Sequence, residues 1–352
     1  MNWWALRIVY YIAPEVFLGT NTRSLQDASM KNTLTLLLLI LALFVAMPTL
    51  AQEAAPTNLR PQWVVGQSAT YDFWSNTQKD ETAQIFGQEQ SETTTFVSEG
   101  KVTWRVDAVN DDGITICTMQ LKVIKLTIKA GQNEPVAFDS ENPAGDNPIF
   151  DNLISAMTQT PLTVTVNADG TIDKVEGIEA LAAAAGDEAA DADIIPEELD
   201  FKDTASDLAT LIAAPASATP GQTWNTTNIW NHEDVFPEAT TKAKWDTTFT
   251  FESIGNIADV PIATIKTKSD VDLQVDLSEL PEGAPDIDVE ISDTSASGEV
   301  LFDLSRHEVV ARHGVMTYTA AITIAPPRPD LPPITVKIVE TNQSQLLRVS
   351  EE

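Results

Sequence analysis

Alternating apolar and polar residues, interrupted by short glycine turns, constrain this chain more than any other feature of its sequence. Val102, Trp104 and Val106 alternate with polar residues, which is typical of a strand with one buried face. At 110–113 an Asp-Gly pair tolerates the positive φ of a tight turn, and the apolar segment 114–128 is predicted to return as a long strand. The sequence therefore favours antiparallel strands joined by hairpins.

The same signals continue along the chain. A second hairpin is predicted at 163–175, around the turn residues Asn167 and Gly170. Apolar residues at helical spacing, or an Ala-rich composition, predict short helices at 147–157, 177–185 and 203–213. Further strands are predicted at 223–230, 244–251, 260–277, 287–292, 299–304, 308–324 and 334–349.

Two parts of the sequence resemble each other in the order of their motifs. Val65-Gly66-Gln67 recurs as Pro220-Gly221-Gln222-Thr223-Trp224, and each is followed by aromatic residues. Residues 164–177 align with 301–314 without a gap. Any two meandering sheets share alternation and turns, but the common order of these motifs favours duplication of a module of roughly 110 residues. We predict a mainly β fold of two similar antiparallel, curved-sheet (half-barrel-like) modules with two or three short helices.

Residues 30–51 have the parts of a secretory signal peptide in the expected order. Lys31 supplies the positive charge, an apolar run follows to Met47, and Thr49-Leu50-Ala51 is a small-residue cleavage pattern. The run is short for a membrane span, which needs about 20 apolar residues, so the alternative of a retained anchor is disfavoured. We predict cleavage after Ala51 and export to the periplasm or the medium.

These boundaries divide the chain into segments. Residues 1–29 are predicted to be a non-native or misassigned extension, with a genuine but unusual leader as the alternative. The predicted segments of the exported chain are a first β-rich half at 52–185, an acidic linker with a helix at 186–219, and a second β-rich half at 220–352.

The charge of the chain limits its partners. It carries 21 Lys and Arg against 52 Asp and Glu, a net charge of −31. Nucleic acids and anionic membrane surfaces both require a basic footprint, so neither is an expected partner. No stable membrane span is expected after signal cleavage. A basic protein of the cell envelope is compatible with this charge, although a solvated acidic surface explains it equally well.

Motifs for catalysis or metal binding are absent from the sequence. The single cysteine, Cys117, excludes an intramolecular disulfide, and its apolar neighbours predict a buried side chain. His307 and His313 fall on one predicted hairpin, but zinc would need a third ligand. We therefore predict no catalytic residue, no metal and no cofactor. An undetected hydrolase with paired carboxylates remains an alternative, because acidic residues are too common here to be informative.

The tryptophans are the better candidates for a functional role. Trp74, Trp104, Trp230 and Trp245 lie in or beside predicted strands. The simplest interpretation is that these tryptophans pack in the core and have only a structural role. A curved sheet that exposed some of them in a concave groove would instead bind a lipid-like small molecule. We predict these four residues as ligand-binding, with a structural or protein-interaction module of the envelope as the alternative function.

Four motifs together also suggest a family. They are Trp63 with Val65-Gly66-Gln67, the hairpin 164–177, Pro220-Gly221-Gln222-Thr223-Trp224, and Phe302-Asp303-Leu304. Their arrangement resembles a bacterial family of secreted, β-rich proteins of unknown function, which implies a fold but no activity. The long strands and few helices are also similar, more distantly, to the half-barrels of periplasmic lipoprotein carriers, and architecture alone does not establish function.

Overall fold

The computed structural model describes residues 56–85, 87–143, 147–168, 170–186, 198–209, 214–236, 239–276, 286–326 and 331–349. The predicted extension at 1–29 and the predicted signal peptide at 30–51 lie outside these residues.

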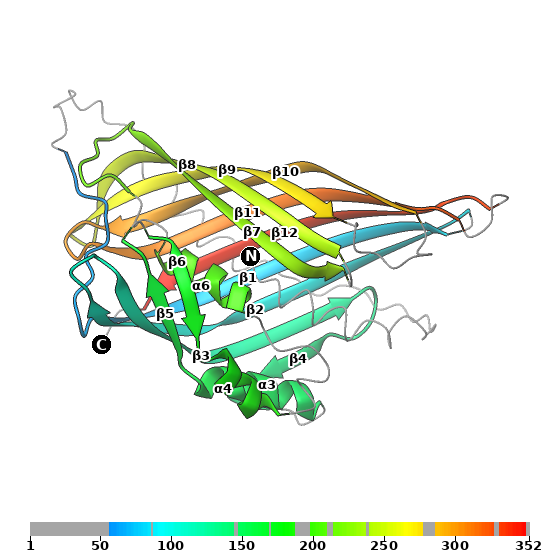
Figure 1. The fold of residues 1–352 in the computed structure, drawn as a ribbon, viewed down its shortest axis with the longest axis horizontal. Helices are drawn as coiled ribbons and strands as arrows, with labels where there is room; N and C mark the ends of the chain where they lie inside the picture. The colour runs from blue at the N-terminus through cyan, green and yellow to red at the C-terminus, as the bar shows by residue number, and fades with distance from the viewer. Residues whose placement is uncertain are drawn as a thin grey trace.

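The described chain is built on one antiparallel sheet of 12 strands that curves into an open cup (Figure 1). The strand order is β6-β5-β3-β2-β1-β12-β11-β10-β9-β8-β7, with β4 paired to β3. The strands are β1 (Ser68–Ile85), β2 (Gln88–Val109), β3 (Thr115–Ala130), β4 (Val136–Asp139), β5 (Leu162–Val166), β6 (Ile172–Glu176), β7 (Thr223–Phe236), β8 (Ala239–Ile257), β9 (Val260–Asp276), β10 (Ile287–Asp303), β11 (Glu308–Ile324) and β12 (Ile334–Arg348).

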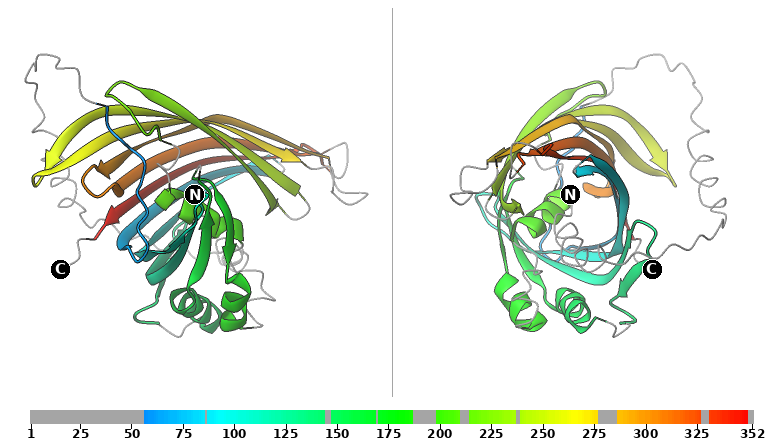
Figure 2. Two further views of the ribbon diagram at one scale, coloured as in Figure 1. Left: turned by 60° about the vertical axis from the view of Figure 1, so that its left-hand side comes forward. Right: turned by 90° about the vertical axis from the view of Figure 1, so that its right-hand side faces the viewer.

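The predicted fold class is confirmed, since the described residues form a curved antiparallel sheet with three short helices. The two predicted halves are parts of a single sheet rather than separate sheets, because β12 pairs with β1 on one side and with β11 on the other. The helices are α3 (Pro148–Gln159), α4 (Ile178–Ala185) and α6 (Glu198–Ala209), and all three lie on the side of β1–β6 (Figure 2).

The helices follow local sequence signals, with one displaced boundary. The side chain of Asn147 caps α3 by accepting a hydrogen bond from the backbone N–H of Phe150 at 3.4 Å. Helix α6 begins at Glu198, earlier than the predicted start at 203, and so occupies part of the predicted linker. Its buried residues Phe201, Ala205 and Leu208 follow a helical repeat, which explains why the helix extends towards its N-terminus.

Two Gly-Gln turns, one before β1 and one before β7, have the same geometry. The N–H of Gly66 donates to the carbonyl of Val106 at 2.8 Å, and Val106 donates back to the turn at 2.9 Å. At the second turn, the N–H of Gly221 donates to the carbonyl of Phe251 at 2.6 Å, and the N–H of Phe251 donates back to the carbonyl of Gln222 at 2.9 Å. The φ angles of Gly66 and Gly221 are 86° and 90°, a region that glycine reaches without a Cβ clash.

Register irregularities also occur at corresponding places. The β2–β3 ladder shifts after Val106, and the β8–β9 ladder shifts after Phe251. The β5–β6 ladder shifts just before Val166, and the β10–β11 ladder shifts just before Phe302. Val166 then pairs with Ile172, and Phe302 pairs with Val309. The ungapped alignment of 164–177 with 301–314 therefore fits the second strand of each hairpin but is one residue out of register in the first.

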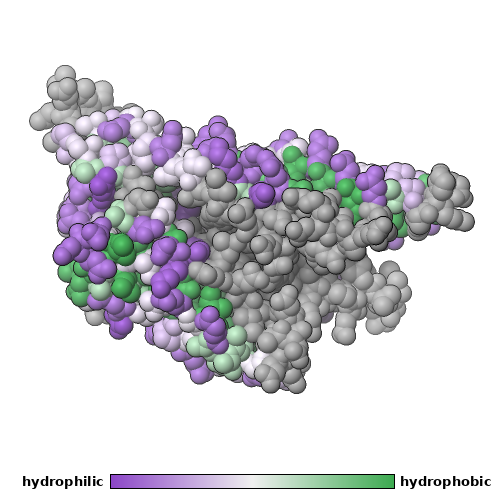
Figure 3. Space-filling model, viewed as in Figure 1, coloured by the Kyte–Doolittle hydropathy of each residue, from purple (hydrophilic) through white to green (hydrophobic). Residues whose placement is uncertain are grey.

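Two hydrophobic clusters lie on one face of the sheet, which we call the inner face. The first cluster spans β1–β6 and all three helices, and includes Trp104, Met119 and Phe150. The second spans β8–β11 and includes Phe251 and Phe302, packed against residues of the connecting segments. Residues that alternate with them, such as His313, Gln343 and Gln345, are exposed on the opposite face. On the visible surface of the described strands, hydrophilic residues are interspersed with apolar patches (Figure 3). The alternation in the sequence thus separates a buried inner face from a wetter outer face.

Candidate functional site: a cavity on the inner face

A cavity of about 80 Å³ lies between the inner face and helices α3 and α6. One buried water needs roughly 10–15 Å³ on this measure, so the cavity has room for more than a single solvent molecule. It is lined by Phe73, Trp74, Ser75, Val102, Met119, Leu121, Ile124, Met157, Phe201, Thr204, Arg312, Asn342, Ser344, Gln345 and Leu346.

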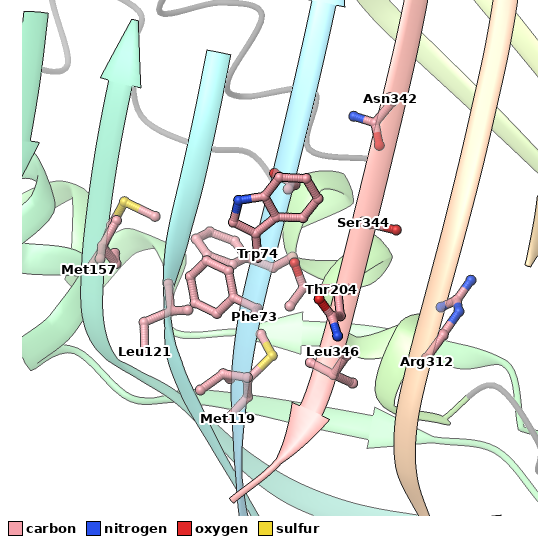
Figure 4. A pocket seen from close by; sticks show the side chains of 15 residues that line it. Phe73, Trp74, Met119, Leu121, Met157, Thr204, Arg312, Asn342, Ser344 and Leu346 are labelled. Atoms are coloured by element: carbon pink, nitrogen blue, oxygen red, sulfur yellow. The ribbon is translucent and has the colours of Figure 1, made fainter. Parts of the chain in front are cut away.

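The two sides of this cavity differ in polarity (Figure 4). Met119 and Leu121 from β3 and Met157 from α3 form an apolar wall. Asn342 and Ser344 from β12 lie on the other side, towards β11. The cavity is therefore amphipathic, as binding sites for small organic ligands usually are.

Two serines form the floor of the cavity, Ser75 of β1 and Ser344 of β12, and they belong to a rung of small residues that continues into β11 and β10. Ser344 pairs with Ser75 across one ladder and with Gly314 across the other. Gly314 in turn pairs with Gly298. None of these residues carries a long side chain, and the two serines lie where the cavity borders the sheet.

Arg312 in β11 occupies the seam between the two hydrophobic clusters. It pairs with Val300 of the second cluster and with Leu346 of the first. Burial lowers the pKa of Arg312 to about 10, so the guanidinium is still protonated at neutral pH. A half-buried cation is therefore placed beside the small-residue floor.

A polar rung crosses β1, β12 and β11 beyond this floor. Glu340 of β12 pairs with Lys79 of β1 and with Tyr318 of β11. The Tyr318 hydroxyl donates to Glu340 Oε2 at 2.9 Å. Glu340 is only 2% exposed, and this burial raises the pKa of its carboxyl.

A second, smaller cavity of about 30 Å³ lies near the first Gly-Gln turn. It is bordered by Trp104, which packs against Trp63 with ring centroids 5.9 Å apart. Beside it Glu308 forms an ion pair with Arg348 at 3.0 Å. This volume suits a single water, so we regard the region as a structural anchor rather than a ligand site.

The four predicted tryptophans are not gathered at one site. Trp74 borders the larger cavity, where strand alternation turns its indole to the opposite face from Phe73. Trp104 borders the smaller cavity, and Trp245 is half-buried in β8. Trp230 belongs to β7, but its side chain lies outside those described. Sequence reasoning missed Arg312, although strand alternation places this residue on the same face of β11 as the apolar residues further along the strand.

The candidates for other chemistry are dispersed among the described residues. Cys117 is fully buried, and desolvation raises the pKa of its thiol to about 12, which disfavours a nucleophilic thiolate. His307 lies in the β10–β11 turn. His313 is exposed and lies opposite Glu299 in the β10–β11 ladder. Within the part of the chain that the structure describes, no three His, Cys, Asp or Glu residues are grouped for a metal ion.

In the described ranges, no helix is both long enough and apolar enough to cross a bilayer.

Comparison with known proteins identifies the family. Residues 112–296 match the model of a family described as a family of unknown function, DUF6263. The chain belongs to DUF6263. The predicted resemblance to a β-rich family of unknown function is thereby confirmed. No curated protein matches this DUF6263 chain.

Solved structures show only distant similarity to this DUF6263 chain. A lipovitellin structure, described by its lipid–protein interactions, covers 82% of the chain at 10% identity and a TM-score of 0.38. The match covers 26% of the lipovitellin chain, so this chain spans about a quarter of that length. An outer membrane channel from Pseudomonas putida F1 covers 82% of the chain, with 97% of its own length matched, at 7% identity and a TM-score of 0.21. Likenesses at this level carry no argument for function.

Proposed function

We propose that this DUF6263 member is an exported, non-enzymatic protein that binds an apolar or amphipathic small molecule on the inner face of its sheet. The observation that carries the proposal is the 80 Å³ cavity, which has an apolar wall, a polar side and a floor of small residues. The signal-like pattern at 30–51 supports export, and an exported protein would meet such a ligand in the cell envelope or outside the cell.

The inner face continues to be apolar beyond the cavity. Past the polar rung at Glu340, three successive rungs of β10, β11 and β12 carry only aliphatic residues. These are Ile291, Ala320 and Ile338, then Val289, Ile322 and Val336, then Ile287, Ile324 and Ile334. A ligand longer than the cavity would therefore find further apolar surface along the same strands.

The first test is to find out what the exported protein carries. We would express the chain from Met30 in a bacterial host and purify it without detergent. Mass spectrometry would then give the mass of the intact protein and identify any small molecule in an organic extract of it. We expect a mass corresponding to residues 52–352 and a stoichiometric lipid-like species. An uncleaved protein in the membrane fraction would contradict the export proposal.

A matched pair of variants on β12 connects any bound species to the cavity. Ser344→Trp fills the floor, whereas Gln343→Trp places the same side chain on the exposed outer face one residue away. We expect the first variant to lose the bound species and the second to retain it. Equal retention by two folded variants would show that the ligand binds elsewhere.

A protein-interaction role is the second candidate, because the sheet has two open ends. In the described part of the chain β6 pairs only with β5, and β7 pairs only with β8. Free strand edges can pair with a strand of another protein, and the acidic charge would favour a basic envelope partner. Salt-sensitive binding of such a partner to an empty, correctly folded protein would favour this candidate.

A further inference from the structure

We propose that the outer edge of β7 is a homodimer interface, at which β7 of a second copy of this chain pairs antiparallel across a two-fold axis through Thr227. The two sheets would then continue into one another, with their inner faces on the same side. This inference goes beyond the proposed function and does not depend on it, because no described residue of β7 lines either cavity.

The two ends of the sheet differ in how they are protected. β6 and β7 are the terminal strands, and among the described strands each has one neighbour (Figure 1). β6 is five residues long, carries the exposed Lys174 and has a register shift in its ladder, three features that hinder pairing with a further strand. β7 is 14 residues long and contains no Lys, Arg or Pro. The sequence therefore protects the edge of β6 and leaves the edge of β7 suited to pairing.

The hydrogen bonds of the second Gly-Gln turn show which backbone groups of β7 face away from β8. The N–H of Phe251 donates to the carbonyl of Gln222 at 2.9 Å, and pairs bonded in this way recur at every second residue of an antiparallel ladder. The even-numbered residues from 224 onward therefore bond to β8, whereas the N–H and C=O groups of the odd-numbered residues point to the outer edge. The side chains of Thr223, Asn225 and Thr227 are exposed beside these groups.

The first half of the sheet shows the corresponding edge when a strand occupies it. Thr70 and Asn225 each lie three residues after the glutamine of a Gly-Gln turn. The carbonyl of Thr70 accepts a hydrogen bond from the N–H of Val349 at 2.8 Å, and β12 continues this antiparallel pairing along β1. The geometry that follows a Gly-Gln turn thus accepts an antiparallel strand at this edge, and the carbonyl of Asn225 points to the same side of β7.

The sequence of β7 is self-complementary about Thr227. When Thr227 lies opposite its own counterpart, Asn225 lies opposite Ile229, and odd-numbered residues face odd-numbered residues throughout. The outward N–H and C=O groups of both copies therefore meet in one ladder. In the same register Trp224 lies opposite Trp230, at a non-hydrogen-bonded position where aromatic cross-strand pairs stabilise a sheet.

The charge of the paired segment permits this contact although the chain is strongly acidic. Residues 223–231 contain no Asp, Glu, Lys or Arg, so no like charges would face each other within the pair. The net charge of −31 on each chain arises elsewhere, and salt screens such repulsion over about 8 Å at physiological ionic strength. Dimerisation should therefore become tighter as salt is added, whereas binding of a basic partner would become weaker.

Sedimentation of the purified exported protein, over a range of concentrations at low and high salt, tests for the dimer. We expect a reversible monomer–dimer equilibrium that shifts towards the dimer at high salt. A monomer at every concentration and salt level would overturn the proposal. Oligomers larger than a dimer would also overturn it, since pairing of β7 with another edge of the next copy would not close.

Cysteine cross-linking tests the register. In a Cys117→Ala background, Thr227→Cys would place two thiols on the two-fold axis, with Cα atoms about 5.5 Å apart, a distance that a disulfide spans. Thr223→Cys is the matched control on the same exposed face, because the two copies of this position would lie about 27 Å apart. We expect a disulfide-linked dimer under mild oxidation for Thr227→Cys alone. Equal cross-linking of the two variants would contradict the proposed register.

A proline at the edge tests the hydrogen bonds. Asn225→Pro removes an N–H that would bond to Ile229 of the second copy, and proline is tolerated where an edge N–H faces solvent. The two-fold axis removes this bond twice, so the dissociation constant of the dimer should rise about tenfold or more. Asn225→Ala keeps the N–H and should dimerise like the original protein. If Asn225→Pro is folded by circular dichroism and dimerises equally well, the β7 edge is not the interface.

Discussion

The two halves of the sheet share their local geometry but differ in what covers them. Both begin with a Gly-Gln turn, and both have register shifts at the same places in their ladders. In the first half, β4 and α3 are inserted between β3 and β5, and α4 and α6 follow β6. In the second half, β9 leads to β10 and β11 to β12 without a described helix between them. The strands therefore form the scaffold, and the connections of one half form the wall of the cavity.

Deleting a core aromatic residue should have the largest effect and test whether the halves unfold together. Phe302→Ala removes a fully buried side chain of the second cluster and should lower the free energy of unfolding by about 3–5 kcal/mol. Because the sheet is continuous through β12, thermal unfolding should remain a single transition that moves to lower temperature.

The measurement is calorimetry together with circular dichroism. Two separate transitions, of which only one is shifted by Phe302→Ala, would show that the halves fold independently in spite of their shared sheet. The Val166→Ala variant at the corresponding place of the first half should shift the same single transition, by less, because valine buries a smaller side chain.

The two Gly-Gln turns should respond equally to loss of glycine. Gly66 and Gly221 both have positive φ, and a Cβ at either position would meet no atom within 4 Å. Gly66→Ala and Gly221→Ala should therefore each cost about 1–2 kcal/mol, through backbone strain alone. Urea unfolding would measure this effect.

The control for these variants is Gly255→Ala in β8, where a Cβ also has open space but the backbone does not require glycine. This change should be close to neutral. Unequal effects at Gly66 and Gly221 would mean that the turns are alike in geometry but not in their contribution to stability.

The polar rung at the seam between the halves predicts a dependence of stability on pH. Burial raises the pKa of Glu340 above that of the unfolded chain, so the folded protein binds this proton more tightly. Stability from this group is therefore greatest below the unfolded pKa of about 4.5 and falls as the pH rises through the folded pKa. Glu340→Gln removes the buried charge and should raise stability at pH 7 by about 1 kcal/mol.

Melting temperatures of the original protein and of Glu340→Gln between pH 4 and 8 would test this sign. Glu290→Gln is the control, because Glu290 is an exposed residue of β10. A larger stability loss for Glu340→Gln at pH 7 than at pH 4 would contradict the prediction, since it would mean that the ionised carboxylate stabilises the fold.

Cysteine labelling should give the smallest perturbation. Cys117 is buried, and its thiol has a raised pKa of about 12, so a thiol reagent should react only after the sheet opens. Ile265 is the equally buried counterpart in β9, since it faces Phe251 as Cys117 faces Val106. In a Cys117→Ala background, Ile265→Cys should be protected to a similar degree. Much faster labelling at 265 would show that the half without helices opens more readily.

Much of the fold could be predicted from local pattern. The hairpin turn at 110–113 has the expected positive φ at Gly113 and a bond from Gly113 N–H to the Asn110 carbonyl at 2.9 Å. The alternation of Val102, Trp104 and Val106 predicted the inner face correctly, because side chains of a strand point to opposite faces in turn. The burial of Cys117 also followed from its neighbours alone.

The cavity could not be predicted, because its residues meet only through pairing between distant strands. Arg312 lies beside Leu346 and Val300 by virtue of the β10–β11–β12 register, and Met157 reaches the same cavity from a helix. The sequence showed which residues favour strands, turns and helices, since those preferences are local. Only the tertiary structure decided that one sheet joins both halves and that Arg312 and an apolar wall border the same cavity, because long-range pairing brings these residues together.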